Sequence, residues 1–141
     1  MSYEVKKVDV WSAEILDQPS GLSSTLKPLV EAGANLSFLL AKRTSAGKGI
    51  VFLSPLEGPA IIKKAKSLGF QKNKDVVAIQ ITGPDKAGLG FSILNAIGSA
   101  GINICGTSAS SIGKNCTVWI SFDNAKDASK ALKLIQKLLA K

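Results

Sequence analysis

The chain contains the same sequence pattern twice. When the sequence is shifted by 68 positions, "DQPSGLSSTLKPLVEAGANL" from Asp17 lies over "DKAGLGFSILNAIGSAGINI" from Asp85 without a gap. A chain of 141 residues can form one ordinary domain or two small ones, and the internal repeat decides for two modules. We expect these modules to span residues 1–72 and 73–141.

Both copies predict the element order β-α-β-β-α. In the second copy, strands are expected at 75–81, 102–111 and 116–122, and helices at 89–100 and 125–141. Gly101 is placed to end the first of these helices, and "DN" is placed to cap the second. The first copy predicts strands at 6–15, 34–43, 50–54 and 70–72, and helices ending near 32 and 69. Pro28 lies inside the first predicted helix, so that helix either starts late, near Ser24, or is kinked.

This order is typical of an α+β, ferredoxin-like βαββαβ unit, in which both helices cover one face of an antiparallel sheet. The second copy leaves no residues for a fourth strand after its last helix. We therefore expect two such repeats, the second lacking its last strand. Because one copy alone has a thin core, we expect the two to pack side by side as a pseudo-dimer.

The residue types exclude several classes of catalyst. Gly83 and Gly88 match the two glycines of a P-loop, but Leu89 and Gly90 follow where lysine and a hydroxyl residue are required, and G-x-G-x-x-G is absent. The chain has no histidine and no common hydrolase motif, so we expect no enzyme activity, no cofactor and no metal. Two cysteines, Cys105 and Cys116, are expected to be small buried apolar residues.

The charge raises the question of nucleic acid. The net charge is +8, and lysines concentrate between Lys63 and Lys74, but Arg43 is the single arginine and aromatic residues are few. A solvated lysine-rich surface therefore explains the charge better than nucleic-acid binding. No apolar run approaches about 18 residues, and no signal peptide is recognisable, so we expect a cytoplasmic protein without membrane contact.

The doubled motif resembles the ACT domain of amino-acid-metabolism regulators. That family places D-x-P-G in a strand-to-helix loop and follows the helix with glycine and a hydrophobic-Asn-hydrophobic strand start. Here the motif reads "DQPS" with "AGANL" and "DKAG" with "AGINI". The resemblance implies a regulatory protein that binds a small effector, most often an amino acid, where the loop of one module meets the strand start of another.

Carried over residue by residue, the resemblance implies two sets of ligand-binding positions. The loop positions are Asp17, Gln18, Pro19, Ser20 and Gly21 in the first copy, and Asp85, Lys86, Ala87, Gly88 and Leu89 in the second. The strand-start positions are Asn35 with Leu36, and Asn103 with Ile104. Ser20 replaces the family's glycine and Ala87 its proline, and we expect the second loop to be the better-preserved site.

Other interpretations stay open at this point. The aspartates and asparagines have the hydrogen-bonding capacity to cap helices or bond their own turns instead of a ligand. The chain could be an adaptor or oligomerisation subunit without a ligand, or an RNA-binding module in which Ile50 and Leu53 occupy the stacking positions. Under the leading hypothesis the partners are an amino-acid effector, a second copy of the chain as a homodimer, and a regulated enzyme.

Overall fold

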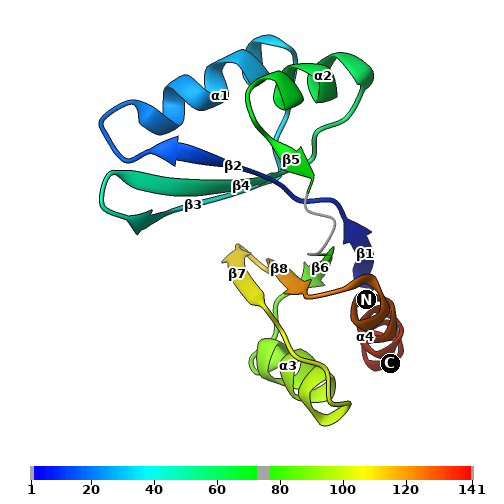
Figure 1. Ribbon diagram of the computed structural model, residues 1–141. Helices are drawn as coiled ribbons and strands as arrows, with labels where there is room; N and C mark the ends of the chain where they lie inside the picture. The colour runs from blue at the N-terminus through cyan, green and yellow to red at the C-terminus, as the bar shows by residue number, and fades with distance from the viewer. Residues whose placement is uncertain (1, 73–76, 141) are drawn as a thin grey trace. The chain divides into compact units, whose positions relative to one another are not determined.

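The computed structural model describes residues 2–72 and 77–140, and these form two compact units (Figure 1). The repeat-1 unit comprises residues 9–72, and the repeat-2 unit comprises residues 2–8 together with 77–140. Each unit is a four-stranded antiparallel sheet with two helices, which confirms the predicted α+β, ferredoxin-like fold.

The repeat-1 unit follows the predicted element order closely. Its elements are β2 (Trp11–Leu16), α1 (Gly21–Glu31), β3 (Phe38–Ser45), β4 (Lys48–Ser54), α2 (Pro59–Ser67) and β5 (Gln71–Lys72), and the strand order is β3-β4-β2-β5. Alternate residues of β2 and β4, such as Trp11, Ala13, Val51 and Leu53, are buried against residues from both helices. The two helices thus share one core on one face of this sheet.

The repeat-2 unit uses a strand from the beginning of the chain. Its elements are β1 (Glu4–Val8), β6 (Val77–Pro84), α3 (Leu89–Ser99), β7 (Gly106–Ile112), β8 (Asn115–Phe122) and α4 (Ala125–Leu139), and the strand order is β1-β6-β8-β7. In this unit β1 pairs with β6 as β5 pairs with β2 in the other, antiparallel and at the corresponding edge.

The predicted strand at 6–15 is therefore two strands in two sheets, separated by Asp9 and Val10. The expected lack of a fourth strand in the second repeat is also corrected. No strand follows α4 among the described residues, but β1 fills the place beside β6. The expected boundaries of 1–72 and 73–141 thus differ from the observed division over the first eight residues.

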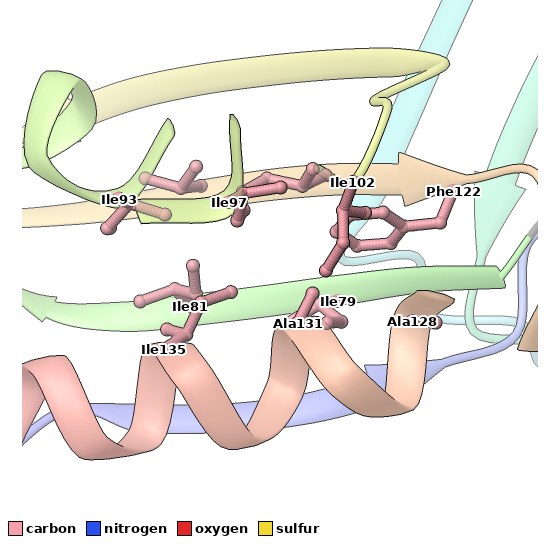
Figure 2. Close-up of a cluster of buried hydrophobic side chains, with 11 residues drawn as sticks. Ile79, Ile81, Ile93, Ile97, Ile102, Phe122, Ala128, Ala131 and Ile135 are labelled. Atoms are coloured by element: carbon pink, nitrogen blue, oxygen red, sulfur yellow. The ribbon is translucent and has the colours of Figure 1, made fainter. Parts of the chain in front are cut away.

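The repeat-2 core is built mainly from isoleucine (Figure 2). Ile79 and Ile81 of β6 lie between residues of α3 and α4, and all of these side chains are almost fully removed from water. The helix residues are Ile93 and Ile97 of α3 with Ala128, Ala131 and Ile135 of α4. Their spacing of three or four along α4 is that of an amphipathic helix with one side in the core.

Several local predictions are confirmed. Gly33 and Gly101 follow α1 and α3 with φ of 100° and 77°, a left-handed conformation that glycine adopts without steric cost. Asn124 caps α4, because its Oδ1 accepts a 2.8 Å hydrogen bond from the Asp127 N–H. Helix α1 begins at Gly21 and includes Pro28, which excludes the late start near Ser24 as one of the two alternatives.

The two cysteines differ in exposure. Cys116 is buried, as predicted, at 8% exposure. Cys105 is exposed, contrary to prediction, because it lies in the connection before β7 and not in a buried strand. Among the described residues, no helix is long and apolar enough to cross a membrane.

Candidate effector loops at two helix starts

The two D-x-P-G-like segments form the same turn. The N–H of Gly21 donates to the Gln18 carbonyl at 3.0 Å, and the N–H of Leu89 donates to the Lys86 carbonyl at 3.1 Å. The third residue of each turn, Ser20 or Gly88, is left-handed, with φ of 64° and 82°. A type II turn requires such a residue at this position and favours proline before it. The motif is therefore first of all a turn signature.

Each copy keeps one of the two favoured turn residues. The first has Pro19 but places Ser20 in the left-handed conformation, and the second has Gly88 but Ala87 before it. Ser20 is the sole non-glycine residue with positive φ in the described part of the chain. The first turn is also crowded, because a Cβ on Gly21 would lie 2.2 Å from the Leu16 carbonyl oxygen.

Both turns lead into helices that have no side-chain cap, so the first-turn N–H groups beyond the one bonded within the turn are uncapped. Helices α1 and α3 have no side-chain cap and no acidic residue in the first turn, whereas α4 has both Asn124 and Asp127 there. Free N–H groups and the positive end of the helix dipole attract an anion such as a carboxylate. Gly90 adds open space on the first turn of α3, since nothing lies within 4 Å of a Cβ built there.

The two loop aspartates have different electrostatic surroundings. Asp17 accepts a hydrogen bond from Arg43 Nε of β3 and forms an ion pair with it, and this carboxylate raises the pKa of the Arg43 guanidinium. The side chain of Asp85 has no hydrogen-bond or ion-pair partner among residues 2–72 and 77–140. The second loop therefore offers an unpaired carboxylate, and the first does not.

Backbone hydrogen bonds fix both loops to the neighbouring hairpins. The N–H of Asp17 donates to Gly47 at 3.1 Å, and the N–H of Asp85 donates to Lys114 at 2.8 Å. Neither aspartate caps its helix, because α1 and α3 have no side-chain cap, and this excludes the capping alternative. They lie one turn before the helix, where their carboxylates remain exposed to solvent.

Tyr3 occupies the space that a glycine leaves before the second loop. A Cβ on Gly83 would lie 2.3 Å from Tyr3 Cδ1, and the Tyr3 hydroxyl donates a 2.8 Å hydrogen bond to the Pro84 carbonyl. Burial and the charge of Asp85 raise the pKa of Cys116, whose Sγ also contacts the Pro84 carbonyl at 3.8 Å. The close approach at Gly83 is therefore made by the protein's own N-terminal segment.

The strand-start positions lie apart from the loops of their own unit. Asn35 and Leu36 precede β3, and Asn103 and Ile104 precede β7, so all four lie in connections after the first helix. Leu36 and Ile104 pack against the two cores, and Asn35 and Asn103 are exposed. Since α3 has 11 residues, its ends are about 16 Å apart, which separates Asp85 from Asn103.

Sequence reasoning missed Arg43 and Tyr3 as neighbours of the loops. Arg43 was noted only as the single arginine of the chain, and no local pattern connects it to Asp17.

The RNA-binding alternative is weakened by the burial of one of its two proposed stacking residues. Leu53 is fully buried and has no surface on which a base could stack. No group of three or more metal-ligating side chains gathers anywhere in the described residues.

Comparison with known proteins gives structural matches alone. No family model and no curated protein sequence matches the chain. The regulatory subunit of aspartate kinase from Thermus thermophilus, in a ligand-free form, matches with a TM-score of 0.65 at 14% identity, over 96% of this chain and 95% of that one. A protein from Bacteroides thetaiotaomicron matches with a TM-score of 0.77 at 18% identity, over 95% and 90%.

A larger enzyme contains the same arrangement as a part. Escherichia coli aspartokinase III, solved with aspartate and ADP, matches with a TM-score of 0.60 at 11% identity, over 99% of this chain but only 33% of that one. The matches at these identities establish the fold, and two of the smaller matched proteins are described as the regulatory subunit and as a putative regulatory domain of aspartate kinase. The chain therefore contains two ferredoxin-like units with the fold of the ACT-type regulatory domains of aspartate kinase.

Proposed function

We propose that the protein is a non-catalytic regulatory protein that binds a free amino acid at the loop before α3, residues 85–89. The observation that carries the proposal is the pairing of two unsatisfied groups in that loop. Asp85 presents an unpaired carboxylate, and α3 begins with uncapped N–H groups a few residues further on. An α-amino acid carries the two complementary charges, an ammonium and a carboxylate, on one carbon.

The first loop is the weaker candidate for the same chemistry. Its carboxylate already has a cation in Arg43, so an ammonium group would compete with an existing ion pair. Gln18 stands where the second loop has Lys86, so the first loop carries no cation of its own, and the neighbouring Arg43 is already paired with Asp17. We propose that the second loop binds the effector and that the first has kept the turn without an equal affinity.

The strand-start asparagines can contribute to a ligand site only at the loop of another module. Asn103 lies at the far end of α3 from Asp85 and cannot contact the same small ligand within one unit. We propose that a second module, as in a homodimer, supplies the strand-start residues to the loop. The output is then a change in affinity for a regulated enzyme, which requires that the effector bind two states of the assembly unequally.

A screen of the common amino acids against the full chain tests the proposal. Thermal unfolding is measured with each amino acid in turn, and isothermal titration follows for any that raises the melting temperature. A ligand present at 100 times its Kd adds about 2.7 kcal/mol to the free energy of unfolding. Asp85→Asn removes a charge-assisted hydrogen bond worth about 1.5–3 kcal/mol, so the Kd should rise at least about tenfold.

The chain itself offers a matched control. Asp17→Asn makes the same change in the first loop, where the carboxylate already forms an ion pair with Arg43. The affinity for the amino acid should therefore stay within about twofold. If no amino acid raises the melting temperature or gives heat on titration, the protein is not an amino-acid sensor. If an amino acid binds but Asp17→Asn weakens it more than Asp85→Asn does, the site is the first loop.

A further inference from the structure

Helix α4 carries a stripe of lysines on its exposed side. Lys126, Lys130, Lys133 and Lys137 are spaced by four, three and four residues along the 15-residue helix, which places them on one side, over about 16 Å. All four are exposed. We call these four residues the α4 lysine stripe.

No acidic side chain neutralises this stripe. None of its four ammonium groups forms an ion pair or hydrogen bond with another side chain of the described residues. Asp127, the one acidic residue of α4, is engaged at the helix start, where its N–H and carboxylate both contact Asn124. Like charges three or four residues apart each destabilise a helix by about 0.2–0.5 kcal/mol, so the stripe weakens α4 when nothing is bound.

The other side of α4 is not available for insertion into a membrane. Ala128, Ala131 and Ile135 are buried in the repeat-2 core, so the helix has no free apolar side to insert among lipid chains. The stripe contains no arginine and no aromatic residue, the side chains that usually provide specific nucleic-acid contacts.

An open hollow lies among the lysines of the stripe. The four lysines, with Ser129 and Leu134, line an open hollow of about 430 Å³. Its lining is mostly apolar, as expected where lysine methylene stems and Leu134 form a surface. Lys7 of β1 donates a hydrogen bond to Ser129 Oγ and adds a fifth cation next to the stripe.

We propose that the α4 lysine stripe docks an acidic helix of a protein partner. A helix with glutamates spaced by four, three and four residues presents carboxylates over the same length and with the same spacing as the lysines. Its binding neutralises the four ammonium groups and places an apolar side chain against Leu134. The stripe lies on α4 and not on the loop of residues 85–89, so this docking does not depend on the proposed amino-acid site.

A synthetic peptide tests the proposal on the full chain. The probe is a fluorescent, alanine-based helical peptide with four glutamates at that spacing, and its binding is measured by anisotropy at low and physiological salt. We expect binding that weakens as salt rises. The variant Lys130→Glu with Lys133→Glu should weaken it at least about tenfold, and a peptide with lysines in place of glutamates should then bind this variant better than the wild type.

A matched variant separates the stripe from the overall charge. Lys63→Glu with Lys64→Glu makes the same change in net charge on α2, where both lysines are exposed, and should leave the affinity within about twofold. Circular dichroism verifies that both variants are folded. The proposal is overturned if the peptide does not bind at low salt, if the α2 variant weakens binding equally, or if duplex DNA or phosphatidylserine vesicles bind the stripe more tightly than the peptide.

Discussion

Single residues in the two turns decide how well each copy of the motif is built. Ser20 has a left-handed conformation that costs an L-residue about 1 kcal/mol, and glycine adopts it freely. Ala87 precedes the left-handed Gly88. A proline at position 87 would fit this turn and would restrict the conformations of the unfolded chain. The two loops thus lack opposite halves of the same turn signature.

We predict that Ser20→Gly and Ala87→Pro each raise the free energy of unfolding by about 0.5–1 kcal/mol, and that Gly88→Ser lowers it by about 1 kcal/mol. A Cβ at Gly88 meets nothing within 4 Å, so the cost is conformational and not steric. Urea unfolding measures all three variants. Gly90→Ala is the control, because Gly90 is helical and equally unhindered, and there the added methyl should stabilise.

Tyr3 and Gly83 form a second residue-scale contact that can be tested. We predict that Tyr3→Phe costs about 0.5–1.5 kcal/mol, because it removes the hydrogen bond to the Pro84 carbonyl and keeps the ring. Gly83→Ala should cost more, since its Cβ would overlap that ring. A double-mutant cycle with Tyr3→Ala should recover most of the Gly83→Ala cost, and additive effects would contradict the contact.

The cysteines give a prediction about reactivity. Iodoacetamide should modify Cys105 in the folded protein and leave Cys116 unmodified, because Cys105 is exposed while burial and Asp85 raise the pKa of Cys116 and keep its thiol protonated. Mass spectrometry of the labelled peptides measures this. Modification of Cys116 at the same rate as Cys105 at neutral pH would show that the repeat-2 unit opens more readily than its core implies.

At the scale of elements, the first strand is the one that local pattern could not assign. "KKVDVWSAEI" is continuously β-prone, and the sequence predicts one strand, but β1 and β2 pair in different sheets. Pairing partners depend on contacts between residues far apart in the chain, and alternation specifies only which side chains share a face. The helices, turns and glycine caps were predictable because their signals lie within a few residues.

The same reasoning explains what was predictable about the site. The loops of residues 17–21 and 85–89 were located from their doubled motif, and the structure confirms the turn before each helix. The ion pair from Arg43 and the hydrogen bond from Tyr3 were not predictable, because their partners are 26 and 81 residues away in sequence. The pairing of Asp17 is therefore a product of the fold, whereas the difference between Gln18 and Lys86 is visible in the sequence.

Removing β1 should unfold one unit and spare the other. Val5 packs against the repeat-2 core, and loss of residues 1–8 would expose the edge of β6 beside Ile79 and Ile81. Each unit contains one buried tryptophan, Trp11 in repeat 1 and Trp119 in repeat 2. In the truncated chain, Trp11→Phe leaves fluorescence that reports on repeat 2, and Trp119→Phe leaves fluorescence that reports on repeat 1.

We expect the truncated chain to show early urea unfolding by Trp119 and little change by Trp11. A peptide of residues 2–9 added in trans should restore the Trp119 transition, because it can pair with β6 as an added strand. A scrambled peptide of the same composition is the control. Equal destabilisation of both tryptophan signals would mean that the two units do not unfold independently.

At the scale of the whole molecule, the chain forms the first strand of the repeat-2 unit, then the whole repeat-1 unit, and then the rest of the repeat-2 unit. β1 belongs to the repeat-2 unit, residues 9–72 build the repeat-1 unit, and β6 resumes repeat 2. We predict that Ile81→Ala, which should cost about 2–5 kcal/mol, speeds hydrogen exchange at Lys6 and Lys7 but not at Ser12 and Ala13. Equal acceleration at both pairs, measured by mass spectrometry or NMR, would contradict this division.

The shared N-terminal strand also determines what an attached probe would report. A fluorophore or affinity tag joined near Ser2 would lie beside β1 and would therefore sense the state of the repeat-2 sheet, although β2 of repeat 1 begins soon after β1 in the sequence. A probe at exposed Glu14 would sense the other sheet instead. Two labels twelve positions apart could thus follow the two repeats separately in one molecule.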